Sequence, residues 1–532
     1  MRPTRRGGSS VHDALVIGAG HNGLACAVHL AAKGWKVAVL EKAPVAGGAV
    51  KSAELTLPGF THDLYAMNLS LFAGSPFFAS YKDGLARHGF ALAPASDCFA
   101  SAFPDGTWLG ISNDLETNLA RIAALSPADA QAWRALSNDF PGDAAHIFGF
   151  LGAPMPSRRM AGVFWKAWRE KGAGWLAETA RLVASSPRDF LDRHFTDPKL
   201  KATLAAWGMH LDFAPDVSGG ALFPYLEAMA NQAFGMVVGQ GGAARMIEAM
   251  VALLRETGGE VHTDAEVAAI ETANGKASAV RLADGRRFEA GRAIVANAHP
   301  KLVFGRMLEE RARPAEYARK LEGFRPGPGT MMLHLALDGL PDWAAGADLK
   351  RFAYVHLAPD MATMAATYAD AMEGLLPREP VLVVGQPTVV DPSRAPEGNH
   401  VLWVQVRVLP GEIRGDAAGA IAARDWDGAK EAYAERVLDV IERYAPGLRG
   451  KILGRAVHSP ADLERDNPNL IGGDNLAGSH HLDQNFLFRP VPGWSRYATP
   501  VKGLHLCGAS TWPGAGTGAG SGFMLGTMLA GG

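Results

Sequence analysis

The chain has 532 residues, a formal net charge of −2, 48% hydrophobic residues and 20% charged residues. This length predicts two or three domains, and the composition is ordinary for a globular protein. The charge balance argues against a nucleic-acid-binding protein, which would carry a strongly basic domain or patch. The three cysteines form no CxxC pair, which argues against a dithiol redox centre and against a metal site.

The first ten residues, MRPTRRGGSS, are basic and lack the apolar core of a secretory signal. Two interpretations are open: a disordered arm, which we favour, and a fragment of an organelle-targeting peptide. The sequence contains no run of 18 apolar residues, so we expect no membrane-spanning helix. We expect a cytoplasmic protein and leave open a peripheral contact with a membrane.

A strand, a glycine-rich turn and a helix are predicted at the start of the chain. Residues 14–17 are an apolar run typical of a buried parallel strand, and residues 24–33 are a helix rich in alanine and leucine. Between them, Gly18, Gly20 and Gly23 permit a tight turn, a close approach to a pyrophosphate and close packing of the helix on the strand. The helix start offers N–H groups and partial positive charge to phosphates.

A second strand, residues 35–40, ends at Glu41, which lies 18 residues after Gly23. A carboxylate at this distance can accept hydrogen bonds from ribose hydroxyls, and it would repel a 2′-phosphate, which disfavours NADP. The motif by itself leaves both NAD and FAD open. The residues assigned to the dinucleotide in this part of the chain are Gly18, Gly20, Asn22, Gly23, Glu41 and Lys42.

Residues 41–48, EKAPVAGG, resemble the glutamate-to-double-glycine segment of the FAD-dependent amine oxidase and phytoene desaturase superfamily. The resemblance implies non-covalently bound FAD, with Gly47 and Gly48 bringing the backbone close to its phosphates. Many members have an arginine after the glycine pair, whereas this chain has Ala49. The implied fold is α/β: a Rossmann-type two-dinucleotide-binding-domain flavoprotein, with a discontinuous substrate domain of mixed sheet and helices.

A second glycine-rich turn, residues 508–520, follows a short strand at 504–507 and precedes an apolar helix at 523–529. Such a helix start can stabilise negative charge on the flavin pyrimidine as the ring is reduced. The segment resembles the closing segment of phytoene-desaturase-like flavoproteins, with Trp512 in place of the usual histidine. The residues assigned to FAD here are Gly508, Ala509, Gly516, Thr517 and Gly518.

Further segments resemble one branch of this superfamily, which holds bacterial carotenoid ketolase and desaturase-like proteins and the animal pyridine nucleotide-disulphide oxidoreductase domain-containing protein 2. Members often carry a histidine at a position that corresponds here to Ala477. The absent CxxC argues against disulphide chemistry in this chain. The segments that carry the resemblance are 391–398, 462–464, 483–484, 489–493 and 497–500.

The resemblance also predicts the domain organisation. The FAD-binding domain would comprise 10–75, 235–300 and 455–532, with the backbone at Val267 contacting the adenine end of FAD. The substrate-binding domain would comprise 76–234 and 301–454. Its first part is helix-rich and interleaves tryptophans with basic residues, so a helix there either lies in a membrane interface or packs on its neighbours, which we favour.

Flavin dehydrogenation needs little from side chains beyond positioning and the exclusion of water, so no catalytic triad is expected. His62, His480 and His481 are the candidates for a catalytic role, and each has a structural hydrogen-bonding role as the competing interpretation.

We expect an FAD-dependent oxidoreductase that dehydrogenates, or desaturates, an apolar substrate of isoprenoid or carotenoid type by hydride transfer to flavin. Two alternatives remain: an oxygen-using FAD oxidase or ketolase acting on a lipid or small molecule, and a non-enzymatic scaffold stabilised by FAD. The electron acceptor is left open, with oxygen and a quinone as the candidates. The oligomeric state is left open.

Overall fold

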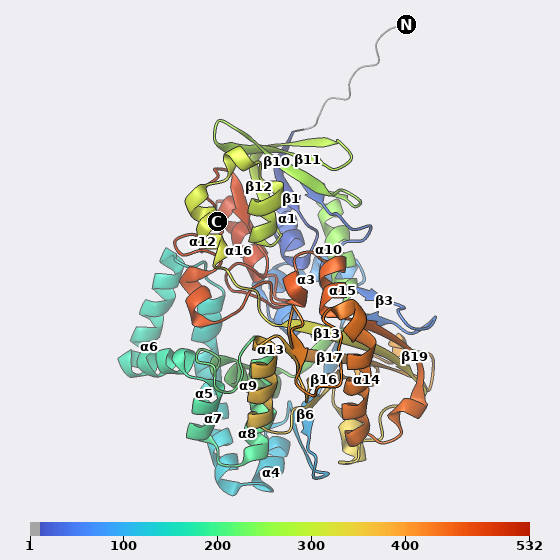
Figure 1. The fold of residues 1–532 in the computed structure, drawn as a ribbon. Helices are drawn as coiled ribbons and strands as arrows, with labels where there is room; N and C mark the ends of the chain where they lie inside the picture. The colour runs from blue at the N-terminus through green and yellow to red at the C-terminus, as the bar shows by residue number, and fades with distance from the viewer. Residues whose placement is uncertain (1–10, 532) are drawn as a thin grey trace.

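The computed structural model of the protein describes residues 11–531. Two seven-stranded sheets lie one beyond the other along the molecule, with helices around both (Figure 1). The expectations for residues 1–10 lie outside the described residues. Within the described chain, no helix is both long and apolar enough to cross a bilayer.

The first sheet is mainly parallel and joins distant parts of the chain. Its strands are short apolar runs buried on both faces, as is typical of a parallel sheet. The glycine-rich turns after β1 and β20 both begin at the carboxyl ends of parallel strands, so they lie on the same side of the sheet. In order the strands are β10 (Val267–Ala273), β11 (Lys276–Leu282), β12 (Arg287–Ala296), β1 (His12–Ile17), β2 (Val37–Leu40) and β9 (Glu260–His262), with β20 (Leu504–Leu506) beside β12.

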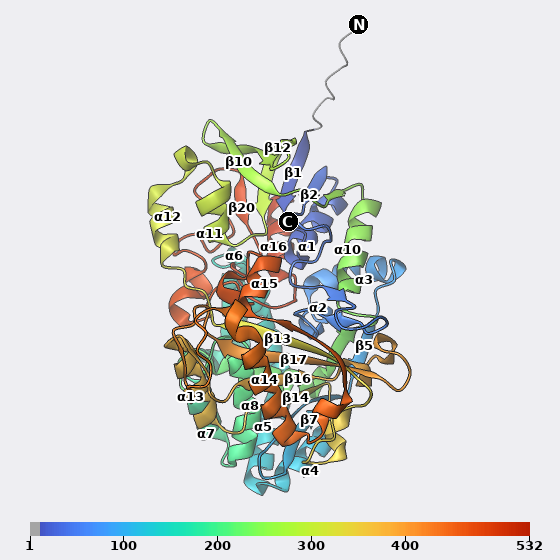
Figure 2. The same ribbon diagram turned by 45° about the vertical axis from the view of Figure 1, so that its right-hand side comes forward.

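Alternate residues of β1 and β2 pack into two different cores. Ala14 and Val16 face a layer of helices, whereas Leu15 and Ile17 face the β10–β11 hairpin and α12 (Ala315–Glu322). Figure 2 shows α10 and α12 on opposite sides of this sheet. The layer of helices comprises α1 (His21–Ala32), α3 (Pro76–Arg87), α10 (Ala244–Glu256) and α16 (Gly520–Leu529).

The second sheet is mixed. One face packs against α14 (Trp426–Tyr444), and the other packs partly against α8 (Pro198–Met209). In order its strands are β19 (Ile452–His458), β13 (Gly329–Leu337), β17 (His400–Leu409), β16 (Val381–Gly385), β14 (Tyr354–Leu357), β6 (Asp97–Ala102) and β7 (Trp108–Ser112).

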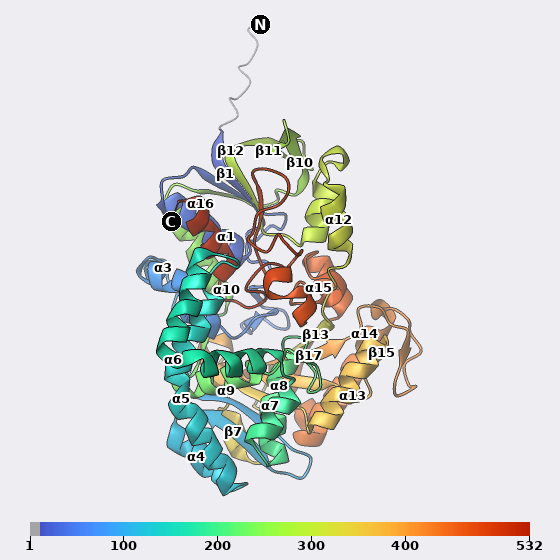
Figure 3. The ribbon, with the colours of Figure 1, turned by 90° about the vertical axis from the view of Figure 1, so that its left-hand side faces the viewer.

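A group of helices flanks the second sheet and extends toward the first, as Figure 3 shows. It comprises α4 (Leu115–Ala123), α5 (Pro127–Leu151), α6 (Arg158–Ala184), α7 (Pro187–His194), α8 and α9 (Leu222–Phe234). The remaining larger helices are α13 (Met361–Met372) and α15 (Pro460–Asp466). Two-stranded ribbons pair β3 (Ser52–Ala53) with β4 (His62–Asp63), β5 (Leu92–Ala95) with β8 (Met236–Gly239), and β15 (Leu375–Leu376) with β18 (Gly415–Asp416).

The first sheet draws its strands from the three segments predicted to form the FAD-binding domain. The second sheet draws most of its strands from the two segments predicted to form the other domain. The predicted boundary at residue 454 falls inside β19, because this strand pairs with β13 and completes the second sheet. The domain assignment itself stays a prediction.

Candidate functional site

A cavity of about 1910 Å³ lies between the two sheets and takes its walls from both. At one end it is lined by the glycine-rich turns of the first sheet. At the other end it is lined by aromatic and aliphatic side chains of the second sheet and of the neighbouring helices.

The glycines at the turn between β1 and α1 have no room for a side chain. A Cβ atom on Gly23 would lie 2.3 Å from the carbonyl oxygen of Gly18, and one on Gly20 would lie 2.9 Å from Nδ2 of Asn297. Gly18 has a φ of 91°, which favours glycine. The helix start therefore packs directly on the turn, leaving its backbone open to the cavity, as phosphate binding requires.

The carboxylate of Glu41 is held at the end of β2 by the backbone. One oxygen accepts a hydrogen bond from the N–H of Ala19 at 2.7 Å, and the other accepts one from the N–H of Ala43 at 2.9 Å. Glu41 and the neighbouring Lys42 both line the cavity. Each carboxylate oxygen keeps a lone pair that a ribose hydroxyl could use.

The two glycine-rich ends of the chain meet at Asn22. Its Oδ1 atom accepts hydrogen bonds from the hydroxyl of Ser521 at 2.9 Å and from the N–H of Gly522 at 3.3 Å. The same serine oxygen accepts a hydrogen bond from the N–H of Gly508 at 2.8 Å. Consequently the N-termini of α1 and α16 lie side by side along the cavity, and both contribute partial positive charge there.

The residues assigned to FAD from the sequence converge on this end of the cavity. Gly23 and Gly47 lie behind it, the first under the turn and the second beside Val50. A Cβ atom on Gly48 would lie 3.2 Å from Cα of Gly20, so the two backbones form a cradle without side chains. This cradle fits a pyrophosphate. The assigned residues that line the cavity are Gly18, Gly20, Asn22, Glu41, Lys42, Gly48, Val267, Gly508, Ala509, Gly516, Thr517 and Gly518.

The other end of the cavity is mainly apolar. Alternate residues of the second sheet, among them Tyr354 on β14 and Trp403 on β17, face it. Their rings stack with centroids 5.7 Å apart. Helices α8 and α9 and the turn after α8 supply the remaining wall, which includes Trp207, Leu211, Phe223, Leu226, Ala230 and Phe234.

Two charged residues in this apolar end were missed by the sequence analysis. Arg407 faces the cavity from β17 and Glu227 faces it from α9. Burial lowers the pKa of Arg407 to about 10 and raises the pKa of Glu227 to about 7. Part of each side chain is exposed to the cavity, and protein atoms enclose the rest. The available signal was a single charge inside an apolar run, at 401–409 and 222–234 respectively.

His62 lies on β4, buried outside the cavity-lining residues. Its Nε2 atom is 2.8 Å from the hydroxyl of Thr56, and its ring meets that of His334 at a centroid distance of 5.5 Å. Burial, together with the charge of Arg394, lowers the pKa of His62 to about 4, so the ring is neutral. Its catalytic role stays a prediction.

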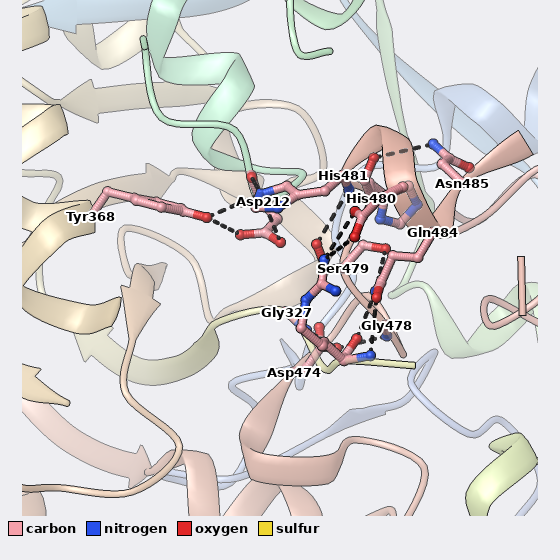
Figure 4. Close-up of polar contacts among 12 residues, drawn as sticks. Asp212, Gly327, Tyr368, Asp474, Gly478, Ser479, His480, His481, Gln484 and Asn485 are labelled. Atoms are coloured by element: carbon pink, nitrogen blue, oxygen red, sulfur yellow. Dashed lines mark hydrogen bonds and ion pairs between the residues drawn. The ribbon is translucent and has the colours of Figure 1, made fainter. Parts of the chain in front are cut away.

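His480 and His481 lie behind the cavity wall, in the network of Figure 4. Nε2 of His480 accepts a hydrogen bond from the N–H of Ala515 at 3.0 Å, which holds the C-terminal glycine-rich turn. Burial, followed by the charge of Arg489, lowers its pKa well below the usual value. Nε2 of His481 lies 3.1 Å from the hydroxyl of Tyr368 and 3.0 Å from the carbonyl oxygen of Asp212. Both histidines therefore hold neighbouring loops together behind the cavity wall. Their catalytic role stays a prediction.

Two positions that depart from the family pattern have structural contacts here. The indole N–H of Trp512 donates to the carbonyl oxygen of Ala153 at 2.9 Å and is buried. Ala477 has a φ of 51°, and its carbonyl oxygen accepts a hydrogen bond from the hydroxyl of Ser510 at 2.8 Å. Both contacts fix the C-terminal turn against neighbouring loops.

Comparisons with known proteins identify the family and the fold. A family model described as flavin containing amine oxidoreductase matches residues 23–521. The chain is 29% identical over 542 residues to pyridine nucleotide-disulfide oxidoreductase domain-containing protein 2 of Rattus norvegicus, covering 95% of this chain and 91% of that protein. It is 26% identical over 528 residues to phytoene desaturase (neurosporene-forming) of Cereibacter sphaeroides, covering 96% and 92% respectively.

A solved structure of an oxidoreductase from Methanosarcina mazei resembles this structure with a TM-score of 0.60 and 19% identity, covering 96% of this chain and 99% of that one. At this identity the likeness shows the fold alone. The predicted superfamily, branch and α/β fold are confirmed by these matches taken together.

Proposed function

Because the chain belongs to the flavin containing amine oxidoreductase family, we propose that it uses FAD to dehydrogenate an apolar, isoprenoid-like substrate. FAD as the cofactor and an FAD-dependent oxidoreductase activity, both predicted from the sequence, follow from the family. The substrate and the desaturation are our proposal. The observation that carries it is the continuous cavity that joins the glycine-rich cradle to an apolar chamber.

When bound, FAD supplies the acceptor for a hydride. Dehydrogenation removes two hydrogens from neighbouring carbons as a hydride and a proton, and a carbon–carbon double bond forms. The residues of the chamber would hold the substrate chain in one orientation and exclude water. Glu227 faces the chamber with a pKa near neutrality, which suits a group that takes up the proton.

The type of substrate is inferred from two supports. The chamber wall is built largely from aromatic and aliphatic side chains, which suit a hydrocarbon chain. A relative across almost the whole length is named phytoene desaturase, and phytoene is an isoprenoid hydrocarbon. Fold alone would be a weak guide, since one fold serves many chemistries.

Anaerobic titration of the FAD-loaded protein tests the proposal. Isoprenoid compounds should bleach the visible flavin absorbance, and the product should carry one more double bond. Bleaching by amines or simple alcohols, without bleaching by isoprenoids, would overturn the isoprenoid assignment. Oxygen readmission then separates the alternatives: peroxide release marks an oxidase, and incorporation of labelled oxygen into the product marks a ketolase.

We also propose that α6 docks on a lipid surface and delivers the substrate. Trp165 and Trp168 are 57% and 54% exposed, and Phe164 beside them is 50% exposed. Arg158 and Arg159, at the start of the same helix, are exposed and line the cavity. Exposed aromatic rings among basic side chains suit the interface of an anionic bilayer.

Co-sedimentation with vesicles of phosphatidylcholine and phosphatidylglycerol tests the docking. The double variant Trp165→Ser, Trp168→Ser should lose binding. Leu453→Ser is the matched control, because Leu453 is 47% exposed on β19, on the opposite flank from α6 in Figure 1. Equal binding by the wild type and the double variant would refute a role for α6.

A further inference from the structure

Within the described residues, the guanidinium of Arg407 forms hydrogen bonds but no ion pair. Its Nη1 atom donates to the carbonyl oxygen of His210 at 3.2 Å and lies 3.5 Å from Oδ1 of Asn475. Its Nη2 atom lies 3.3 Å from Nδ1 of His210, and its Nε atom is buried without a partner. Among residues 11–531, no carboxylate forms an ion pair with this guanidinium.

Two fully buried arginines of the same chain have their charge or their N–H groups fully matched. Arg394 forms ion pairs with Asp63 and Asp391. Arg489 is surrounded by backbone carbonyl oxygens, which accept hydrogen bonds from all three of its nitrogens. Arg407 is partly buried, with its Nε atom fully buried, and it has neither ion pairs nor a full set of carbonyl acceptors. The lost solvation is costly unless a ligand supplies the anion.

Side chains next to Arg407 also lack hydrogen-bond acceptors. Trp403 and Gln405 alternate with Arg407 along β17, so the three side chains occupy one face of the second sheet. The indole N–H groups of Trp403 and Trp207 are buried donors without hydrogen-bond acceptors. Buried polar atoms in native proteins nearly always have partners, so such a cluster beside a cavity indicates an absent polar ligand.

The surrounding walls define the rest of that ligand. Leu211, Phe223 and Leu226 line the same chamber and suit an apolar chain. A carboxylate matches a single guanidinium, which can hold its two oxygens with two parallel hydrogen bonds. Glu227 lines the chamber too, and a ligand with one negative charge is less repelled by it than a phosphate dianion would be.

Arg407 lies toward the end of the cavity where the glycine-rich turns are. Asn475, its contact, lies two residues before Ala477, whose carbonyl oxygen accepts the hydroxyl hydrogen bond of Ser510 in the C-terminal glycine-rich turn. The guanidinium therefore lies on the side of the chamber where the two ends of the cavity join.

We propose that Arg407 binds the carboxylate of an apolar, chain-like acid, which makes the substrate an acid rather than a hydrocarbon. This inference rests on the proposed function for the role of the ligand as substrate. It does not depend on that function for the binding itself.

Binding is measured with the FAD-loaded protein, by quenching of tryptophan fluorescence and by shifts of the flavin spectrum. Two matched pairs serve as probes: farnesoic acid with farnesol, and dodecanoic acid with dodecanol. At least one acid should bind roughly tenfold or more tightly than its alcohol, as loss of a hydrogen-bonded charge implies. In Arg407→Met this preference should disappear, and in Arg407→Lys part of it should remain.

The matched control is Arg455→Met. Arg455 belongs to β19 of the same sheet, but its guanidinium pairs with Glu431 and Glu435 on α14, outside the chamber. This variant should keep the full preference for the acid. Because the ratio of acid to alcohol affinity is the readout, a general loosening of the chamber would weaken both probes and leave the ratio unchanged.

Equal binding of acids and alcohols by the wild type, or binding of neither acid, overturns the proposal whether or not the variants fold. An acid preference that persists in Arg407→Met overturns it as well. Failure of the proposed function is recorded separately in the same titration. Selective binding of acids without bleaching under anaerobic conditions would refute the dehydrogenation and support the carboxylate site. Bleaching by hydrocarbons without a preference for acids would support the dehydrogenation and refute the carboxylate site.

Discussion

The guanidinium of Arg489 donates two hydrogen bonds to the carbonyl oxygen of Ala509, from Nε at 3.0 Å and from Nη2 at 2.8 Å. The same group donates to the carbonyl oxygens of Gly478 and Ser479 at 3.0 and 2.7 Å. One buried cation therefore holds the loop around residue 478 against the C-terminal glycine-rich turn that lines the cavity.

Arg489→Met should lower the free energy of unfolding by about 3 kcal/mol or more, because several buried carbonyl oxygens lose their donors together. FAD retention should fall with it, since Ala509 lines the cavity. Urea denaturation and the absorbance ratio of flavin to protein measure both effects. Arg319→Met is the control, because Arg319 is exposed on α12 and does not line the cavity. A change no larger than in the control would contradict the role of Arg489.

Gly23→Ala should abolish FAD retention. The added Cβ would lie 2.3 Å from the carbonyl oxygen of Gly18, so α1 must move away from the turn whose backbone lines the cavity. Gly162→Ala on α6 is the matched control, because a Cβ there meets no atom within 4 Å, and it should be neutral or slightly stabilising. The flavin content of the two purified variants is the measurement. A Gly23→Ala protein with full flavin content would contradict the packing argument.

Glu41→Gln should weaken FAD binding by roughly tenfold, as loss of charged hydrogen bonds implies. Both carboxylate oxygens accept backbone N–H bonds, from Ala19 and Ala43, whereas a glutamine would direct its own NH₂ group at one of those donors. Titration of FAD-depleted protein with FAD, followed by flavin fluorescence, gives the affinity. Glu54→Gln, at an exposed position, should bind FAD as the wild type does.

Arg394→Met should lower the free energy of unfolding by about 3–5 kcal/mol, because Asp63 and Asp391 would stay buried without their counter-charge. The cluster connects β4 with the loop before α10, since Asp63 accepts from the N–H of Ala243 at 2.7 Å. Urea denaturation of FAD-saturated protein measures the loss. Arg286→Met, on the exposed β11–β12 turn, should change it by less than about 0.5 kcal/mol.

Glu227 should make the folded state less stable as the pH rises. Burial raises its pKa in the folded state to about 7, above its ordinary value of 4.5. The folded state therefore favours the protonated carboxyl, so this contribution is full below pH 4.5 and is lost as the pH rises through 7. Unfolding free energies between these limits should decline with pH less steeply in Glu227→Gln. Parallel profiles for the two proteins would show that Glu227 does not titrate this way.

Much of the cofactor end was predictable because its signals are local. The strand at 14–17, the turn Gly18–Gly23 and the helix at 24–33 correspond to β1, the loop and α1 with boundaries shifted by a few residues. Glycines needed for a turn and a helix start are fixed by backbone sterics over a short stretch. The same holds for β20 and α16 at the other end of the chain.

The chamber could not be predicted in the same way, because its residues come from strands and helices far apart in sequence. Arg407 and Glu227 acquire their shifted pKa values only because the second sheet and α9 enclose them. The histidine candidates show the converse. His480 and His481 were adjacent to a family motif in sequence, but folding places both behind the cavity wall.

The sequence by itself determined the dinucleotide cradle and the superfamily, because closely spaced glycines, a helix start and one carboxylate specify that geometry locally. Only the tertiary structure decided that Asn22 meets Ser521 across almost the whole chain and that a lone guanidinium faces an apolar chamber. Such contacts depend on which elements pack together. Burial of those elements then sets the charge state and the missing partners of the side chains between them.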